Sequence, residues 1–131
     1  MAPGDRPLSP HLQIYRPQIT SVMSILHRLT GIGLWVGALL LTFLVGSATY
    51  GPEAFNRVQE LIESWFGQLV LLGLTVAVYY HLANGIRHLA WDIGWGYEIK
   101  RLKYTGLIVI WFTGIMTAIT FLVGYRMAGV I

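Results

Sequence analysis

The stretch that decides the fold runs from Phe66 to Asp92 and reads FGQLVLLGLTVAVYYHLANGIRHLAWD. Its first part, Phe66–Tyr80, contains no charged residue and predicts a helix that is already deep in an apolar medium where the second part begins. The second part then places two histidines, an asparagine and an arginine in that medium. Polar groups at such depth are costly and usually mark function.

Four residues of this stretch, both histidines among them, share one face of the predicted helix. They recur at offsets of four, seven and eleven residues, which bring side chains to the same side of a helix. The set is His81, Gly85, His88 and Asp92. We expect the functional site to include this face.

The composition points to a membrane protein. The chain has 131 residues, of which 55% are hydrophobic and 11% charged, whereas about a quarter of a soluble domain is charged. Leu29–Ala48 and Tyr104–Tyr125 contain no charge, and Phe66–Ala90 is a third, interrupted apolar run. Runs of about 18 or more apolar residues predict membrane spans. The sequence therefore predicts an all-α membrane protein with three transmembrane helices in a single domain and no soluble catalytic domain.

The expected boundaries follow from the apolar runs and the prolines. Prolines at positions 3, 7, 10 and 17 rule out a continuous helix at the start. We expect a surface arm over 1–20, helix I over about 21–49, helix II over about 65–91 and helix III over about 104–125. Pro52 favours a helix start, so the first connection, 50–65, should hold a short interfacial helix. Gly33 and Gly37 form a small-xxx-small pair suited to helix packing.

The composition excludes disulfides and cysteine-ligated clusters, and it argues against nucleic-acid binding. Cysteine is absent, which excludes disulfides and any iron–sulfur cluster ligated by this chain. The net charge of +3 comes from few charges, so their distribution across the membrane matters more than their sum. We therefore expect no nucleic-acid partner.

The basic residues predict the orientation. Six lie on one side of the expected spans, Arg6, Arg16, Arg28, Lys100, Arg101 and Lys103, and two lie on the other, Arg57 and Arg126. The positive-inside rule then places the N-terminus in the cytoplasm. In this topology the start of helix I and the end of helix II meet on the cytoplasmic side.

The depth of His81 makes it a candidate haem ligand. It lies eleven residues inward from Asp92, roughly 16 Å along a helix and about half of a hydrocarbon core of about 30 Å. A neutral imidazole is a good axial ligand for haem iron, and Gly85 would leave room for a flat macrocycle. An interhelical hydrogen bond explains a lone membrane histidine equally well.

Basic side chains near the cytoplasmic edge suit the haem propionates. Those expected there are His27, Arg28, Arg87 and His88. Ser24 and Arg28, one helical turn apart, could hydrogen-bond the carbonyl oxygens of a quinone. The alternative is a capping serine and an arginine that reaches toward lipid headgroups.

Two parts of the sequence together resemble a known family. The first is Arg6-Pro-Leu-Ser-Pro-His-Leu12 followed by Ser24-Ile-Leu-His-Arg-Leu-Thr30, and the second is His81-Leu-Ala-Asn-Gly-Ile-Arg-His-Leu-Ala-Trp-Asp-Ile-Gly94. They resemble the two signatures of the cytochrome b membrane-anchor subunit of succinate dehydrogenase, respiratory complex II. The signatures cover about a third of the chain, and we find no departure at their defining positions.

The resemblance implies a function in electron transport. Such a subunit carries no active site for succinate. With a second small membrane-anchor subunit it forms a helical bundle that anchors a flavoprotein subunit and an iron–sulfur subunit to the lipid membrane. Electrons from succinate pass through those subunits to ubiquinone, the substrate reduced where the iron–sulfur subunit meets the membrane.

The resemblance also implies roles for individual residues. His81 corresponds to one axial ligand of the iron in a haem b whose other ligand comes from the second membrane subunit. Ser24 and Arg28 correspond to quinone-pocket residues, and His27, Arg28 and His88 lie near the haem propionates. No catalytic residue is expected.

The expected location is a bacterial cytoplasmic (inner) membrane, because only five residues precede the first signature. Two other functions compete with this prediction. One is a structural membrane anchor that binds neither haem nor quinone. The other is a small transporter subunit whose histidines relay protons, although acidic residues are absent from mid-membrane.

Overall fold

A computed structural model describes residues 16–131 as a chain of helices without a strand. The helices are α1 (Ile19–Ser47), a 3-10 turn η1 (Ala48–Tyr50), α2 (Pro52–Glu63), α3 (Trp65–Asp92) and α4 (Ile99–Met127). Residues 1–15 lie outside the described part, and with them most of the expected arm, His11 and the Arg6–Leu12 part of the first signature.

Three helical segments in the described part are long and apolar enough to cross a membrane. They are Ile19–Tyr50, Trp65–Asp92 and Ile99–Met127, with mean hydropathies of 2.0, 1.6 and 2.2. This confirms the prediction of an all-α protein with three candidate spans. The 29 residues of α1 make a helix of about 43 Å, which exceeds a hydrocarbon core of about 30 Å and suits a strong tilt.

The start of α4 differs from the expected bound near residue 104. The helix begins at Ile99, so that Lys100, Arg101 and Lys103 lie in its first turns rather than in the connection. Arg101 forms an ion pair with Glu98, its N-cap residue, at 3.1 Å. The end of the charged residues in the sequence marks where the apolar core of the membrane begins. The helix itself begins earlier, because it includes the charged residues that lie in the interface. The true connection is therefore only 93–98, where Gly94 and Gly96 adopt the positive φ values expected of turn formers.

The short helix α2 connects the first two spans, as the sequence predicts. Pro52 occupies its first turn, and Ser64 ends it and caps α3 through its Oγ, which accepts a hydrogen bond from the Gly67 N–H at 3.1 Å. A Cβ at Gly67 would lie 2.2 Å from the Leu61 carbonyl oxygen. Glycine is therefore required where the chain folds back from α2 into α3.

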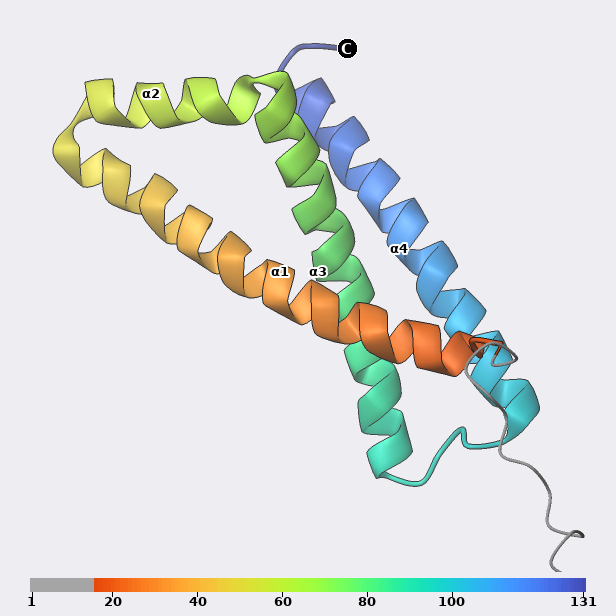
Figure 1. Ribbon diagram of the computed structural model, residues 1–131. Coiled ribbons are helices and arrows are strands. Elements are labelled where there is room, and N and C mark those ends of the chain that lie inside the picture. The colour runs from red at the N-terminus through yellow and green to blue at the C-terminus, as the bar shows by residue number, and fades with distance from the viewer. Residues whose placement is uncertain (1–15) are drawn as a thin grey trace, which may run out of the picture.

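The helices α1, α2 and α3 outline a triangle, and α4 runs alongside α3 (Figure 1). α1 crosses α3 in its N-terminal half and then diverges, so that α2 spans the gap at the far end. The C-terminus lies at the α2 end of the molecule (Figure 1). The one close crossing of α1 and α3 is thus where residues far apart in sequence come together.

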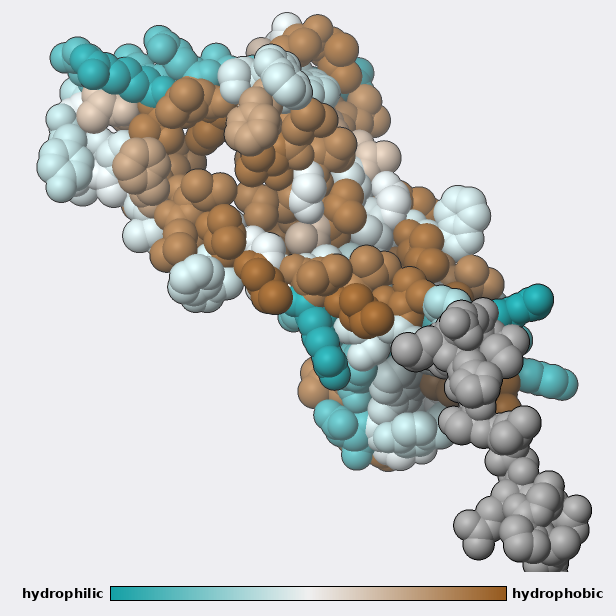
Figure 2. All heavy atoms as spheres, in the orientation of Figure 1, coloured by the Kyte–Doolittle hydropathy of each residue, from teal (hydrophilic) through white to brown (hydrophobic). Residues whose placement is uncertain are grey.

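The buried core is small and lies near this crossing. Met23, Tyr80 and Val109, one from each long helix, form it. The Tyr80 hydroxyl donates to the Met23 carbonyl at 2.9 Å, and a Cβ at Gly106 would lie 2.8 Å from the Met23 sulfur. Hydrophobic side chains cover much of the remaining surface over the middle of the helices (Figure 2), which is the surface that lipid or partner helices would cover.

The expected glycine pair has unequal neighbours. A Cβ at Gly37 would lie 2.7 Å from a methyl carbon of Leu74 on α3. A Cβ at Gly33 would have no neighbour within 4 Å among the described residues. Of the pair, Gly37 alone allows close helix packing within the described chain.

Candidate functional site

The crossing of α1 and α3 is built from two histidines that each face a glycine of the other helix. A Cβ at Gly31 on α1 would lie 3.1 Å from His81 Cε1, and one at Gly85 on α3 would lie 3.8 Å from His27 Cε1. The space at Gly85 that we expected for a macrocycle therefore faces the His27 ring. Small residues let the two helices approach closely enough for the imidazoles to meet.

Three imidazoles form a stack, here called the histidine column and consisting of His27, His81 and His88. The His27 and His81 ring centroids lie 3.9 Å apart with the planes 12° from parallel. The His88 ring lies 5.1 Å from the His27 ring, tilted by 31°, and meets Trp91 edge-on at 4.8 Å. The structure thus brings together three residues that lie on two separate stretches of the sequence.

The His81 ring is held by two hydrogen-bonding groups of α1. Its Nδ1 lies 3.1 Å from the His27 carbonyl oxygen and 3.2 Å from the Thr30 hydroxyl. A carbonyl oxygen only accepts hydrogen bonds, so this contact places the proton on Nδ1. The other nitrogen, Nε2, is then an unprotonated imidazole nitrogen with a free lone pair.

This arrangement fits a haem ligand. Metal-bound histidines commonly donate their second ring N–H to a backbone carbonyl, as His81 does here. His27 covers a face of the His81 ring and not its edge, because the two rings are stacked. Nε2 makes no hydrogen bond to the described residues, and it is not fully buried among them. The interhelical hydrogen bond and the ligand role are therefore compatible, since they use different nitrogens.

The histidine column does not form a metal centre by itself. The His27 and His81 rings stack face to face, and residues 16–131 contain no group of three or more His, Asp or Glu side chains that could hold a metal ion. A metal bound at His81 would need its other ligands from outside this part of the chain.

Arg87 does not join the basic cluster that we expected at the propionate edge. It is 6% exposed and points toward α4. Its Nε donates to the Thr105 hydroxyl at 3.0 Å and its Nη2 to the Leu102 carbonyl at 2.9 Å. A guanidinium inside an apolar medium needs acceptors, and the first turns of α4 supply them. The expectation for Arg87 is thus replaced by a structural contact between α3 and α4.

Arg87 makes two further contacts. We call Arg87 and its hydrogen-bond partners, Asn84, Thr105 and the Leu102 carbonyl, the Arg87 network. Nη1 of Arg87 donates to the Asn84 side-chain oxygen at 3.3 Å, and the guanidinium lies 4.2 Å from the Trp91 ring centroid. Asn84 is fully buried, and its side-chain nitrogen has no partner among the described residues. The sequence indicated that these residues were unusual but not that they face α4.

Ser24 and Arg28 occupy neighbouring turns of α1, as the sequence predicts. Ser24 lies inside α1, which begins at Ile19, so it is not a capping serine. Ser24 is half-buried and Arg28 exposed, and neither side chain makes a hydrogen bond or ion pair with the described residues. A cavity of about 680 Å³ lies between the starts of α1 and α4 and has Ile19 and Lys103 in its wall. Neither Ser24 nor Arg28 lines this cavity.

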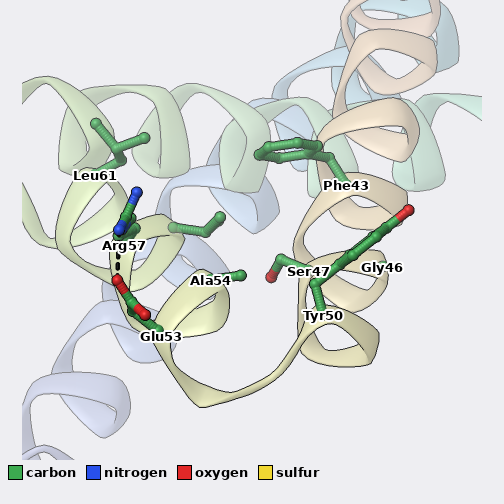
Figure 3. Close-up of a pocket in the computed structure, with 9 residues that line it drawn as sticks. Phe43, Gly46, Ser47, Tyr50, Glu53, Ala54, Arg57 and Leu61 are labelled. Carbon is green, nitrogen blue, oxygen red and sulfur yellow. Dashed lines mark hydrogen bonds and ion pairs between the residues drawn. The ribbon is translucent and has the colours of Figure 1, made fainter.

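Another pocket lies at the opposite end of the molecule, between α2 and the end of α1 (Figure 3). Its volume is about 650 Å³, and Arg57 and Glu53 in its wall form an ion pair with each other. Ser47 and Tyr50 contribute its other polar groups. No histidine lines it, so it is separate from the histidine column.

Thr30 and Gly31 were missed by reasoning from the sequence alone. A signal for them exists: the segments His27-Arg-Leu-Thr-Gly31 and His81-Leu-Ala-Asn-Gly85 both place a glycine four residues after a histidine. On a helix that spacing puts the glycine beside the histidine on one face. Two such segments predict a crossing in which each histidine faces the glycine of the other helix.

Comparisons with known proteins identify a family that this chain matches over most of its length. Residues 3–121 match the family described as succinate dehydrogenase/fumarate reductase transmembrane subunit. A succinate dehydrogenase cytochrome b556 subunit from Paracoccus denitrificans is 38% identical over 92% of this chain and 92% of its own length. The subunit of that name from Rickettsia conorii is 43% identical over 80% of this chain and 82% of its own length.

A further relative extends the likeness. The succinate dehydrogenase cytochrome b560 subunit of Marchantia polymorpha is 36% identical over 81% of both chains. The family match covers α1, α2 and α3 completely and most of α4. The chain therefore belongs to the succinate dehydrogenase/fumarate reductase transmembrane subunit family.

Proposed function

We propose that this chain is the haem b- and quinone-binding membrane-anchor subunit of a succinate:ubiquinone oxidoreductase. It has no succinate site of its own and contributes to the site of quinone reduction. Membership of the family and the names of the relatives, which are cytochrome b subunits of succinate dehydrogenase, support this proposal.

His81 Nε2 is the proposed iron ligand. The observation that carries this assignment is the pair of α1 acceptors on His81 Nδ1, which leaves Nε2 unprotonated. When bound, a haem b supplies one-electron redox chemistry within the membrane. His27 and His88 adjoin His81 in the histidine column, and Arg28 follows His27 with no partner among the described residues. These three residues are the proposed propionate partners.

Ser24 and Arg28 are the proposed quinone-binding residues on this chain. A serine hydroxyl and a guanidinium both donate hydrogen bonds to carbonyl oxygens. Neither side chain has a partner in the described chain, and the cavity between the starts of α1 and α4 does not include them. Their pocket would therefore take its remaining walls from other subunits.

The proposed partners follow from the same considerations. A second small membrane-anchor subunit would supply the other iron ligand, as the resemblance to the family implies; the neighbouring His27 ring stacks on a face of His81 and does not point at its edge. An iron–sulfur subunit and a flavoprotein subunit would bind on the side where α1 begins. We place the complex in a bacterial cytoplasmic (inner) membrane, with the N-terminus of this chain in the cytoplasm, as its basic residues predict.

The haem assignment is tested by spectroscopy of the purified complex. We expect the parent complex to show a reduced-minus-oxidised b-type spectrum and His81→Ala to lose it, because an axial ligand is removed. His88→Ala is the matched variant and should keep a b-type spectrum, since His88 is assigned to the propionate side. A parent complex with no haem in proportion to this chain would instead favour a structural anchor.

The quinone assignment is tested by comparing two electron acceptors. Ser24→Ala and Arg28→Ala should slow quinone reduction at least about tenfold, the effect of about 1.4 kcal/mol of lost transition-state stabilisation. Succinate oxidation with a soluble artificial acceptor should be unchanged, because that reaction bypasses the membrane site. Normal quinone reduction in both variants would refute the assignment.

A further inference from the structure

Thr30 connects α1 to the proposed haem ligand. It is half-buried at the crossing of α1 and α3, and its hydroxyl oxygen lies 3.2 Å from His81 Nδ1. The same hydroxyl lies 2.9 Å from each of two carbonyl oxygens of its own helix, those of Leu26 and His27. Within the described chain, Thr30 is therefore the only threonine of α1 whose side chain reaches the histidine column.

The direction of each hydrogen bond follows from the number of protons available. A hydroxyl has one proton, and the nearby carbonyls of α1 can only accept it. Toward His81 the Thr30 oxygen is then an acceptor. The His27 carbonyl is a second acceptor at the same nitrogen, 3.1 Å away. Two acceptors at Nδ1 hold its proton there and fix the plane of the ring.

We propose that Thr30 is a positioning residue for His81: it holds the Nδ1 proton and ring plane of His81 so that Nε2 is presented to the haem iron. This inference rests on the proposed function, because it assigns a role toward the same haem. An acceptor on the second nitrogen of a metal-bound histidine makes the imidazole a stronger electron donor, and removal of such a partner typically weakens metal binding about 10–100-fold.

Thr42 provides a matched control on the same helix. Its hydroxyl donates to the Ala38 carbonyl at 2.8 Å, which repeats the bond of Thr30 within its own helix. Thr42 is exposed, and no other hydrogen bond of its side chain to the described residues exists. Replacing either threonine by valine removes the same intrahelical bond, but only the change at Thr30 removes an acceptor from His81.

The experiment compares Thr30→Val, Thr30→Ser and Thr42→Val in the purified complex. Two properties of the haem are measured, the midpoint potential and the electron paramagnetic resonance g values, which report the orientation of the axial ligands. In Thr30→Val we expect a more positive midpoint potential, because a weaker donor stabilises ferric iron less, together with altered g values. Thr30→Ser and Thr42→Val should match the parent, since both keep a hydroxyl next to His81.

The outcomes separate this inference from the proposed function. Thr30→Val with the potential and g values of Thr42→Val would overturn the role of Thr30. If Thr30→Val assembles without haem, a normal Thr30→Ser supports the role of the hydroxyl, and an equally defective Thr30→Ser overturns it. Loss of the haem signal in His81→Ala alongside an unchanged Thr30→Val would leave the proposed function standing and remove only this inference.

Discussion

At the scale of single residues, close packing and hydrogen bonding determine how His81 is presented. Groups of α1 contact one edge of the ring: Gly31 faces Cε1, while the His27 carbonyl and the Thr30 hydroxyl lie at the neighbouring Nδ1. None of these contacts requires a charge. The orientation of the ring is therefore set by the shape of α1 and by two neutral acceptors.

Gly31→Ala should disturb His81 and lower the stability of the complex. A Cβ at this position would lie 3.1 Å from His81 Cε1, and overpacking of this kind costs about 1–3 kcal/mol. The matched variant is Gly33→Ala, whose Cβ would meet nothing within 4 Å. That change should be neutral or stabilising by up to about 1 kcal/mol, because alanine favours a helix.

Thermal midpoints and haem spectra of the two glycine variants provide the measurement. We expect a lower midpoint and a perturbed spectrum in Gly31→Ala alone. Equal behaviour of the two variants would show that the close contact at Gly31 does not constrain the His81 ring.

At this scale the sequence predicted some residues and not others. His81, His88 and Arg87 stand out because polar side chains are rare at membrane depth. Thr30 does not, because a threonine in a membrane helix commonly bonds its own backbone, as Thr42 does. Which threonine also reaches another helix depends on where the helices cross.

At the scale of helices, the Arg87 network joins α3 to α4. The guanidinium of Arg87 donates three hydrogen bonds within the described chain, and two of them end on α4. Because Arg87 is 6% exposed, removal of an acceptor would leave a buried N–H without a partner. The network thus fixes how α3 is rotated against α4, and with it the face of α3 that carries His81.

Thr105→Val should destabilise the packing of α3 against α4. The Arg87 Nε donates to this hydroxyl at 3.0 Å, and a buried donor without its partner costs about 1–3 kcal/mol. Thr113→Val is the matched control on α4, since the Thr113 hydroxyl is buried but donates only to the Val109 carbonyl of its own helix. A thermal midpoint that falls more in Thr105→Val than in Thr113→Val is the expected result, and the opposite order would contradict it.

Helix positions were more predictable than helix faces. The long apolar runs indicated three spans, and the structure places its long helices over those runs. The rotation of α3 was not predictable, because Arg87 and His88 are adjacent in sequence and each could face either neighbour. The structure separates them: His88 lies against α1, and Arg87 lies against α4.

At the scale of the whole molecule, the chain has far more apolar surface than its own core buries. Trp35 is 67% exposed and Trp111 70% exposed, although both lie in candidate spans. The three long helices leave most of their faces uncovered (Figures 1 and 2). This apolar surface suits contact with lipid or with other membrane helices.

The proposed orientation can be tested with single cysteines, because the natural sequence has none. Asn56→Cys on α2 and Lys100→Cys at the start of α4 introduce thiols at exposed positions on opposite sides of the expected membrane. A membrane-impermeant maleimide should label the α2 position in intact spheroplasts and the α4 position only after permeabilisation, as the positive-inside rule predicts. The reverse pattern would place the N-terminus outside.

The central claim is that His81 supplies an axial ligand of a haem through Nε2, and chemical rescue tests it most directly. In the purified complex, His81→Gly should lack the low-spin b-type spectrum, and imidazole supplied during assembly should restore it by occupying the vacated ligand position. His88→Gly should show no dependence on imidazole. A His81→Gly complex that keeps the full low-spin spectrum without imidazole would contradict the claim.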